Sequence, residues 1–124
     1  MRLARREILV MQPGPEMDVL VASHIFGQPF LAGQKSPPRF STSYYDAGLL
    51  LRKLQMSYDC PVRPVGNNYL AGVIPLDISI REIIGPCFAC GETFMEAICK
   101  AALLAAMGNA ILDDAFLLPD SMAA

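Results

Sequence analysis

The chain has 124 residues, which is enough for one domain with one hydrophobic core. Hydrophobic residues make up 53% of it, but Lys100 interrupts the longest apolar stretch before it reaches the roughly 18 residues that span a membrane. The net charge is -2 and the isoelectric point is near 5.2, which argues against binding across the phosphates of duplex nucleic acid. The apolar segment at 8–11 is too short for a signal peptide, so we expect a cytoplasmic protein with no membrane partner.

The first part of the chain predicts two helices. A short one covers residues 5–11, and a second covers 15–26 and stops at Gly27. Proline is tolerated in the first turn of the second helix, where Glu16 and Asp18 favour the positive end of its dipole. Helical spacing assigns its core face to Met17, Leu20, Val21, His24 and Ile25. We therefore expect His24 to be a structural histidine rather than a ligand or a base.

A loop over residues 28–39 precedes a third helix, which runs to about residue 55 and has several candidate N-caps in residues 40–43. Its predicted inward stripe consists of Tyr44, Ala47, Leu50, Leu51 and Leu54. Tyr45, Leu49 and Arg52 share one flank, which brings an aromatic ring and a guanidinium together. The alternative is a tyrosine at the edge of the sheet beside a solvated arginine.

Strands are predicted after residue 57. Residues 58–65 and 69–74 flank a Gly66-Asn67-Asn68 turn, which is typical of a hairpin. Prolines at 61, 64 and 75 remove ladder donors, so these strands should lie at an edge or contain bulges. A further strand is expected over residues 76–84.

The segment after residue 91 predicts a long, capped and apolar helix. Thr93 and Glu96 have the spacing of a capping box, and Glu96 and Lys100 form one polar stripe on an alanine-rich cylinder. Such a helix needs neighbours on two sides. We place a domain boundary after Gly108, so that residues 1–108 form the domain and 109–124 an amphipathic extension that docks on it or on another subunit. The apolar surface of both segments predicts a homo-oligomer.

The four cysteines are expected to be reduced thiols. Cys99 lies among alanines and is interpreted as a small buried hydrophobe. Cys87 and Cys90 have metal-ligand spacing, but zinc needs four ligands and the chain has one histidine and no second such pair. We expect neither a metal nor another cofactor, and interpret these thiols as part of the end of an apolar strand.

No nucleophile with a base and no paired carboxylates are evident, so we expect a protein that is not an enzyme. Binding of a phosphate-bearing ligand needs cations, aromatic faces and free amides at a helix start. Residues of these kinds gather near 39–45 and in the hairpin. The predicted ligand-binding residues are Arg39, Phe40, Ser41, Thr42, Tyr44, Tyr45, Arg52, Arg63 and Tyr69. The alternative for each is an ordinary surface arginine or core aromatic.

Three segments resemble the phage ABA sandwich domain, a family of small bacteriophage and prophage proteins. They are REILVMQPG at 6–14 running into EMDVLVA at 16–22, FST at 40–42, and GET at 91–93 leading to EAICKAAL at 96–103. The resemblance implies an α+β fold, a three-layer α/β/α sandwich with a small, mainly antiparallel sheet. It also implies a phage origin and no known enzyme activity.

Small phage proteins often act against the host cell, and fold alone does not decide how. We expect a non-enzymatic protein of the host bacterial cytoplasm that sequesters a small nucleotide-derived signal of host immunity. The alternative is a protein that inhibits a host protein by binding it directly, using the apolar tail.

Overall fold

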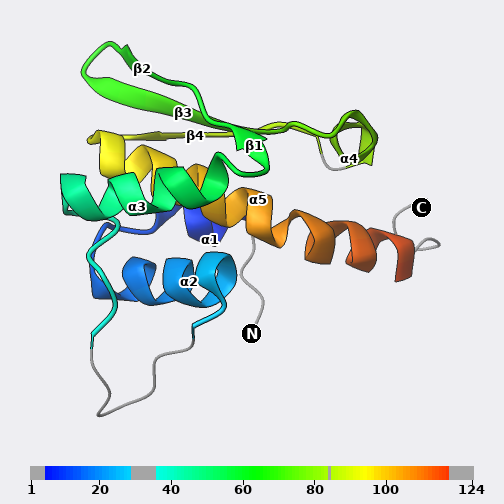
Figure 1. The fold of residues 1–124 in the computed structure, drawn as a ribbon, viewed down its shortest axis with the longest axis horizontal. Helices are drawn as coiled ribbons and strands as arrows, with labels where there is room; N and C mark the ends of the chain where they lie inside the picture. The colour runs from blue at the N-terminus through cyan, green and yellow to red at the C-terminus, as the bar shows by residue number, and fades with distance from the viewer. Residues whose placement is uncertain (1–4, 29–35, 84, 118–124) are drawn as a thin grey trace.

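The computed structural model describes residues 5–28, 36–83 and 85–117, with side chains as far as Met107 except that of Ile83. It is an α+β fold that combines helices with a small antiparallel sheet (Figure 1). The helices are α1 (Arg5–Val10), α2 (Pro15–Phe26), α3 (Tyr44–Leu54), α4 (Ile78–Ile83) and α5 (Phe94–Leu117). The strands are β1 (Tyr58–Asp59), β2 (Val62–Val65), β3 (Asn68–Pro75) and β4 (Cys87–Gly91). Within these ranges, none of the helices is both long and apolar enough to cross a bilayer.

Helix α2 has the predicted bounds. Gly27 ends it with a φ of +67°, a left-handed conformation that glycine adopts without strain. The Gly27 and Gln28 amides then donate to the last carbonyls of the helix. Met17 and Val21 are buried as predicted. His24 is exposed, so the prediction of a structural core histidine is wrong.

Helix α3 begins at Tyr44 because the Ser43 side chain accepts a hydrogen bond from the Asp46 amide at 3.3 Å. Ala47, Leu50 and Leu54 are buried, as the predicted stripe requires. Tyr44 is 72% exposed, because it stands at the first position of the helix beyond the reach of the core. Its assignment to the inward stripe is therefore wrong.

The sheet is built around β3. The predicted hairpin is confirmed: Val65 pairs with Asn68 across a turn in which Gly66 has a φ of +62°. Strands β1 and β2 pair with one side of β3, and β4 pairs with the other side. All of these pairings are antiparallel.

The prediction of a strand over residues 76–84 is wrong, because residues 78–83 form α4. The Asp77 carboxylate accepts from the Ser79 amide at 2.9 Å and from the Ser79 hydroxyl at 2.6 Å, and the Asp77 carbonyl accepts from the Arg81 amide. This arrangement caps a helical turn. The hydrogen bonds from Ser79 also hold the pKa of Asp77 below its usual value.

Helix α5 is the centre of the molecule. It contacts β3 and β4 on one side and α1, α2 and α3 on others, and residues 96–105 are buried. In Figure 1 the sheet forms an outer layer, α3 and α5 lie beneath it, and α1 and α2 lie beneath them. These helices share one side of the sheet. Within the described ranges, the predicted arrangement with helices on both faces is not confirmed.

The cap of α5 differs in one detail from the prediction. Thr93 Oγ1 accepts from the Glu96 amide at 3.1 Å as expected, but the Glu96 carboxylate accepts from the Glu92 amide instead of that of Thr93. Glu96 and Lys100 form a buried ion pair at 2.7 Å. Lys100 Nζ also donates to the Leu9 carbonyl at 2.8 Å, so the predicted polar stripe is an internal link between α5 and α1.

Two expectations about the end of the chain can be compared with α5. The helix continues through Gly108 and Asn109 to Leu117, so the predicted domain boundary after Gly108 falls within one helix. Since the side chains of 108–117 and all of 118–124 lie outside the described residues, the division into 1–108 and 109–124 stays a prediction. The apolar sides of α5 up to Met107 are covered by other elements of the same protomer. The apolar surface of this part of the helix therefore gives no reason to expect an oligomer.

A groove lined by aromatic residues

The segment 39–45 is held by internal bonds. Phe40 is 2% exposed and stacks on Phe26 with 5.2 Å between ring centroids. The amide and the hydroxyl of Ser41 both donate to Oδ1 of the buried Asp18, at 2.8 and 2.7 Å. Ser41 Oγ also accepts from the Gly14 amide at 2.9 Å. Phe40 and Ser41 are therefore structural residues, which corrects their assignment to a ligand site.

Backbone amides near the start of α3 already donate hydrogen bonds to side chains of the protein. The Arg39 amide donates to Asp46 Oδ2 at 2.9 Å, and the Asp46 amide donates to Ser43 Oγ. The Asp18 carboxylate accepts a hydrogen bond from the Ser41 amide in the same region. Two acidic side chains at a helix start disfavour a phosphate there, so the structure gives no physical basis for the predicted anion site at residues 39–45.

A groove of about 380 Å³ lies beside this segment, and three of the predicted residues meet in it. We call it the aromatic groove. Its lining residues come from α3, β2, β3, the segment between β1 and β2, and the start of α5. They are Tyr44, Leu51, Cys60, Val62, Arg63, Pro64, Tyr69 and Phe94. The predicted residues Arg39, Thr42, Tyr45 and Arg52 are exposed but do not line it.

Local structure fixes the aromatic side chains of this groove. Tyr44 and Phe94 are the first residues of α3 and α5, so the Ser43 and Thr93 caps set their positions. Their rings meet edge to face at a centroid distance of 5.3 Å. Tyr69 stands opposite Pro64 in the hairpin. The sequence prediction missed Phe94, although an aromatic directly after a capping residue is a local indication of a ring held at a helix start.

The electrostatics of the aromatic groove are simple. Arg63 is the charged residue among its lining residues. Burial, aided by the charge of Asp59, raises the pKa of the Cys60 thiol to about 11, so this thiol is neutral and a poor nucleophile at neutral pH. The lining offers an aromatic surface with one guanidinium and no carboxylate. This combination suits a flat ring that carries an anionic group.

Cys87 and Cys90 lie on opposite faces of β4. They are three residues apart in a strand, so their side chains alternate; Cys87 is buried and Cys90 is exposed. The two thiols therefore cannot bind one metal ion together. The residues with described positions contain no group of three or more histidine, cysteine or acidic side chains arranged to hold a metal.

We expect Cys90 to react faster than the other thiols when the folded protein is treated with a disulfide reagent at pH 8. Burial raises the pKa of Cys87 and of Cys99, and at a pKa near 11 only about a thousandth of Cys60 is thiolate at pH 8. Raising the pH to 10 should therefore accelerate Cys60 about a hundredfold. Peptide mass spectrometry over time measures each site. Equal rates for Cys60 and Cys90 at pH 8 would contradict this expectation.

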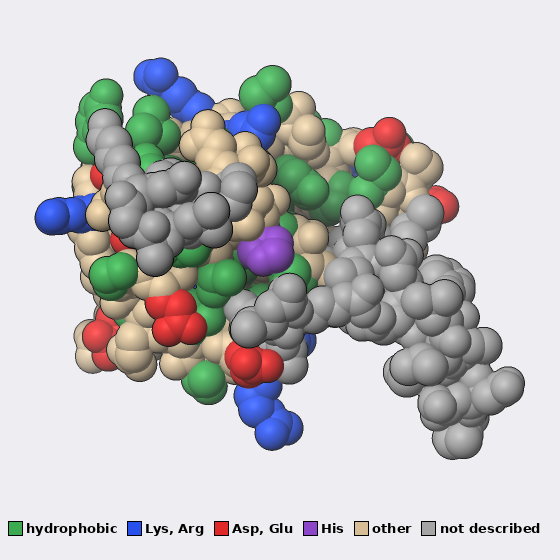
Figure 2. All heavy atoms as spheres, turned by 90° about the horizontal axis from the view of Figure 1, so that it is seen from below, with side chains coloured by type: hydrophobic (Ala, Val, Ile, Leu, Met, Phe, Trp, Pro, Cys, Tyr) green, Lys and Arg blue, Asp and Glu red, His purple; other side chains and the backbone are tan. Residues whose placement is uncertain are grey.

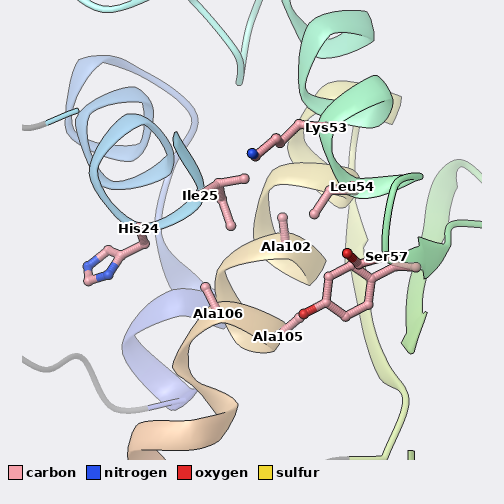
Figure 3. A pocket seen from close by; sticks show the side chains of 9 residues that line it. His24, Ile25, Lys53, Leu54, Ser57, Ala102, Ala105 and Ala106 are labelled. Carbon is pink, nitrogen blue, oxygen red and sulfur yellow. The ribbon is translucent and has the colours of Figure 1, made fainter. Parts of the chain in front are cut away.

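A second hollow, of about 170 Å³, lies among α2, α3 and α5 (Figure 3). Its floor consists of Ala102, Ala105 and Ala106, and the Lys53 side chain reaches across it toward Ile25. The His24 ring points away from α5. The volume is below the roughly 300 Å³ at which pockets for drug-sized molecules begin, so this hollow is a poorer ligand site than the aromatic groove.

The face formed by α2 is shown in Figure 2. His24 is exposed on it, and the acidic and basic side chains visible there are scattered among hydrophobic ones. Such a mixed surface lacks the basic stripe that tracks a nucleic acid backbone.

Comparison with known proteins finds similarity to a solved phage structure. No protein-family model matches the chain, and no curated protein matches it. The 2.0 Å crystal structure of a phage protein from Bacillus cereus ATCC 14579 does match, with 26% sequence identity and a TM-score of 0.58. The alignment covers 77% of this chain and 88% of that protein. The chain is therefore similar to a phage protein, whereas its resemblance to the ABA sandwich family is not confirmed.

Proposed function

We propose that the protein binds and sequesters a small nucleotide-derived ligand in the aromatic groove without catalysing a reaction on it. The observation that carries the proposal is the meeting of Tyr44, Tyr69 and Phe94 with Arg63 around one opening. The rings offer surfaces for a base, and the guanidinium offers paired donors for a phosphate. The volume falls within the usual range for small-molecule sites.

The absence of catalysis is part of the same proposal. The lining residues include no histidine and no carboxylate, and Cys60 has a raised pKa. A general base or an activated nucleophile would be expected in a catalytic groove. Similarity to a phage protein supports a role inside an infected bacterium, where uptake of a host immune signal would protect the phage.

We expect calorimetry to detect binding of at least one member of a panel of cyclic dinucleotides and cyclic ADP-ribose isomers. Arg63→Ala should weaken that binding by about tenfold to a hundredfold, because a charge-assisted contact contributes about 1.5–3 kcal/mol. Tyr69→Ala should weaken it by a similar factor, since base stacking contributes about 1–3 kcal/mol. Arg52→Ala is the matched control: it removes the same charge from an exposed site outside the groove and should leave affinity unchanged.

Two outcomes would overturn the proposal. One is equal loss of affinity in Arg52→Ala and Arg63→Ala, which would indicate a nonspecific charge effect. The other is a panel without binding together with stoichiometric recovery of a host protein in pull-downs. In that case, direct inhibition of a host protein would replace sequestration as the function.

A further inference from the structure

The two edges of the sheet differ in how they resist pairing with another strand. The edge formed by β1 and β2 contains Pro61, Arg63 and Pro64, and prolines and charges are the usual protection of a sheet edge. Strand β4 forms the other edge, on the far side of β3 (Figure 1). Its sequence from Cys87 to Gly91 has no proline and no charge. Among the described residues, this edge therefore lacks the usual protection against strand addition.

The register shows which backbone groups of β4 point outward. The Gly72 amide donates to the Pro61 carbonyl at 2.8 Å, so the N–H and C=O of Gly72 point away from β4. Gly72 stands opposite Phe88, and Leu70 stands opposite Cys90. Because bonding direction alternates along antiparallel strands, Phe88 and Cys90 also direct their N–H and C=O groups away from β3. Among the described residues, no other backbone group bonds to these outward groups.

We propose that this edge pairs with β4 of a second copy of the chain, antiparallel and about a two-fold axis at Ala89. This register places Phe88 opposite Cys90 of the second copy and Cys90 opposite its Phe88. Each such pair can exchange both of its backbone hydrogen bonds, so the outward groups satisfy one another. Each copy thus contributes the same strand, β4, to a two-fold symmetric (isologous) interface.

Side chains and charges favour a second copy as the occupant. Phe88 is 43% exposed and Cys90 is exposed, both on the face of the sheet away from α5. The Phe88 ring lies against Gly72 of β3, so it leans toward the inside of the sheet and leaves the outward backbone groups of β4 accessible. Strand β4 carries no charged side chain, so two identical strands meet in this register without like charges opposite each other.

The first test uses the unmodified protein. Sedimentation velocity at micromolar concentration should give a dimer, and a short bifunctional thiol reagent should link the two Cys90 side chains, which lie about 7–8 Å apart as diagonal neighbours. Cys90→Ser should abolish the cross-link and keep the dimer. A monomer across the concentration range, or a dimer whose Cys90 side chains are not linked, would overturn the proposal.

The second test compares Cys90→Pro with Cys90→Ser. Both remove the thiol, but only proline removes the outward N–H, so Cys90→Pro should weaken dimerisation by at least about tenfold while Cys90→Ser does not. If the proline variant does not fold, amide hydrogen exchange of the natural protein at different concentrations provides the test instead. The Phe88 and Cys90 amides should lose protection on dilution to the monomer, while the inward Ala89 amide keeps it. Concentration-independent exchange at all three would overturn the proposal.

Discussion

Lys100→Met is expected to lower the free energy of unfolding by about 3–5 kcal/mol, the range measured when one partner of a buried ion pair is removed. The variant leaves the Glu96 carboxylate buried without its cation and the Leu9 carbonyl without its donor. Methionine fills most of the space of the lysine stem, so little of the loss comes from a cavity. Urea denaturation monitored by far-UV circular dichroism measures it.

The matched control for this variant is the double substitution E96Q/K100M. Glutamine keeps an oxygen that can accept from the Glu92 amide but carries no charge. If the buried charge causes the loss, the double variant should recover more than half of it, because replacing both charges of a buried pair is often nearly neutral. A double variant less stable than Lys100→Met would show that the charge is not the cause.

Asp18→Ala is expected to cost about 2–4 kcal/mol, since it leaves the Ser41 amide and hydroxyl without the acceptor they share. These groups join the start of α2 to the segment before α3, so the loss should also loosen residues 39–43. Ser41→Ala is the comparison: its amide can still donate to Asp18, but the Gly14 amide loses its acceptor, so we expect a smaller cost of about 1–2 kcal/mol. Equal costs in the two variants would refute this account of Asp18.

Local signals in the sequence predicted the elements that depend on neighbouring residues. Gly27 and Gly66 adopt the positive φ that their positions suggested, and Ser43 is one of the expected caps of α3. The segment after Pro75 was misassigned because its alternating isoleucines match a strand. Ile78 and Ile80 are exposed, so the alternation of apolar residues is not stabilised by burial of one face of a strand. The hydrogen bonds of Asp77 instead favour the start of a helix.

Residues distant in sequence decide what the prediction missed. Ser41 looked like a free hydroxyl at a helix start, but its partner Asp18 lies 23 residues earlier. Strand β4 forms because Ala71 and Val73 provide a template for it, and its own composition is a weak strand signal. The groove residues Tyr44, Arg63 and Tyr69 were chosen by type, and only the fold brought them to one place.

The central position of α5 has a consequence for how the protein is made. Helices α1, α2 and α3 and strands β3 and β4 all contact α5, which follows them in the chain. Lys100 of α5 also donates a hydrogen bond to the Leu9 carbonyl, 91 residues earlier. The ribosome must therefore complete most of the polypeptide before the apolar faces of α2, α3 and β3 can be covered. Nascent chains that lack α5 would expose those faces to chaperones and proteases. Folding should begin only after α5 emerges, at a rate limited by closing long loops.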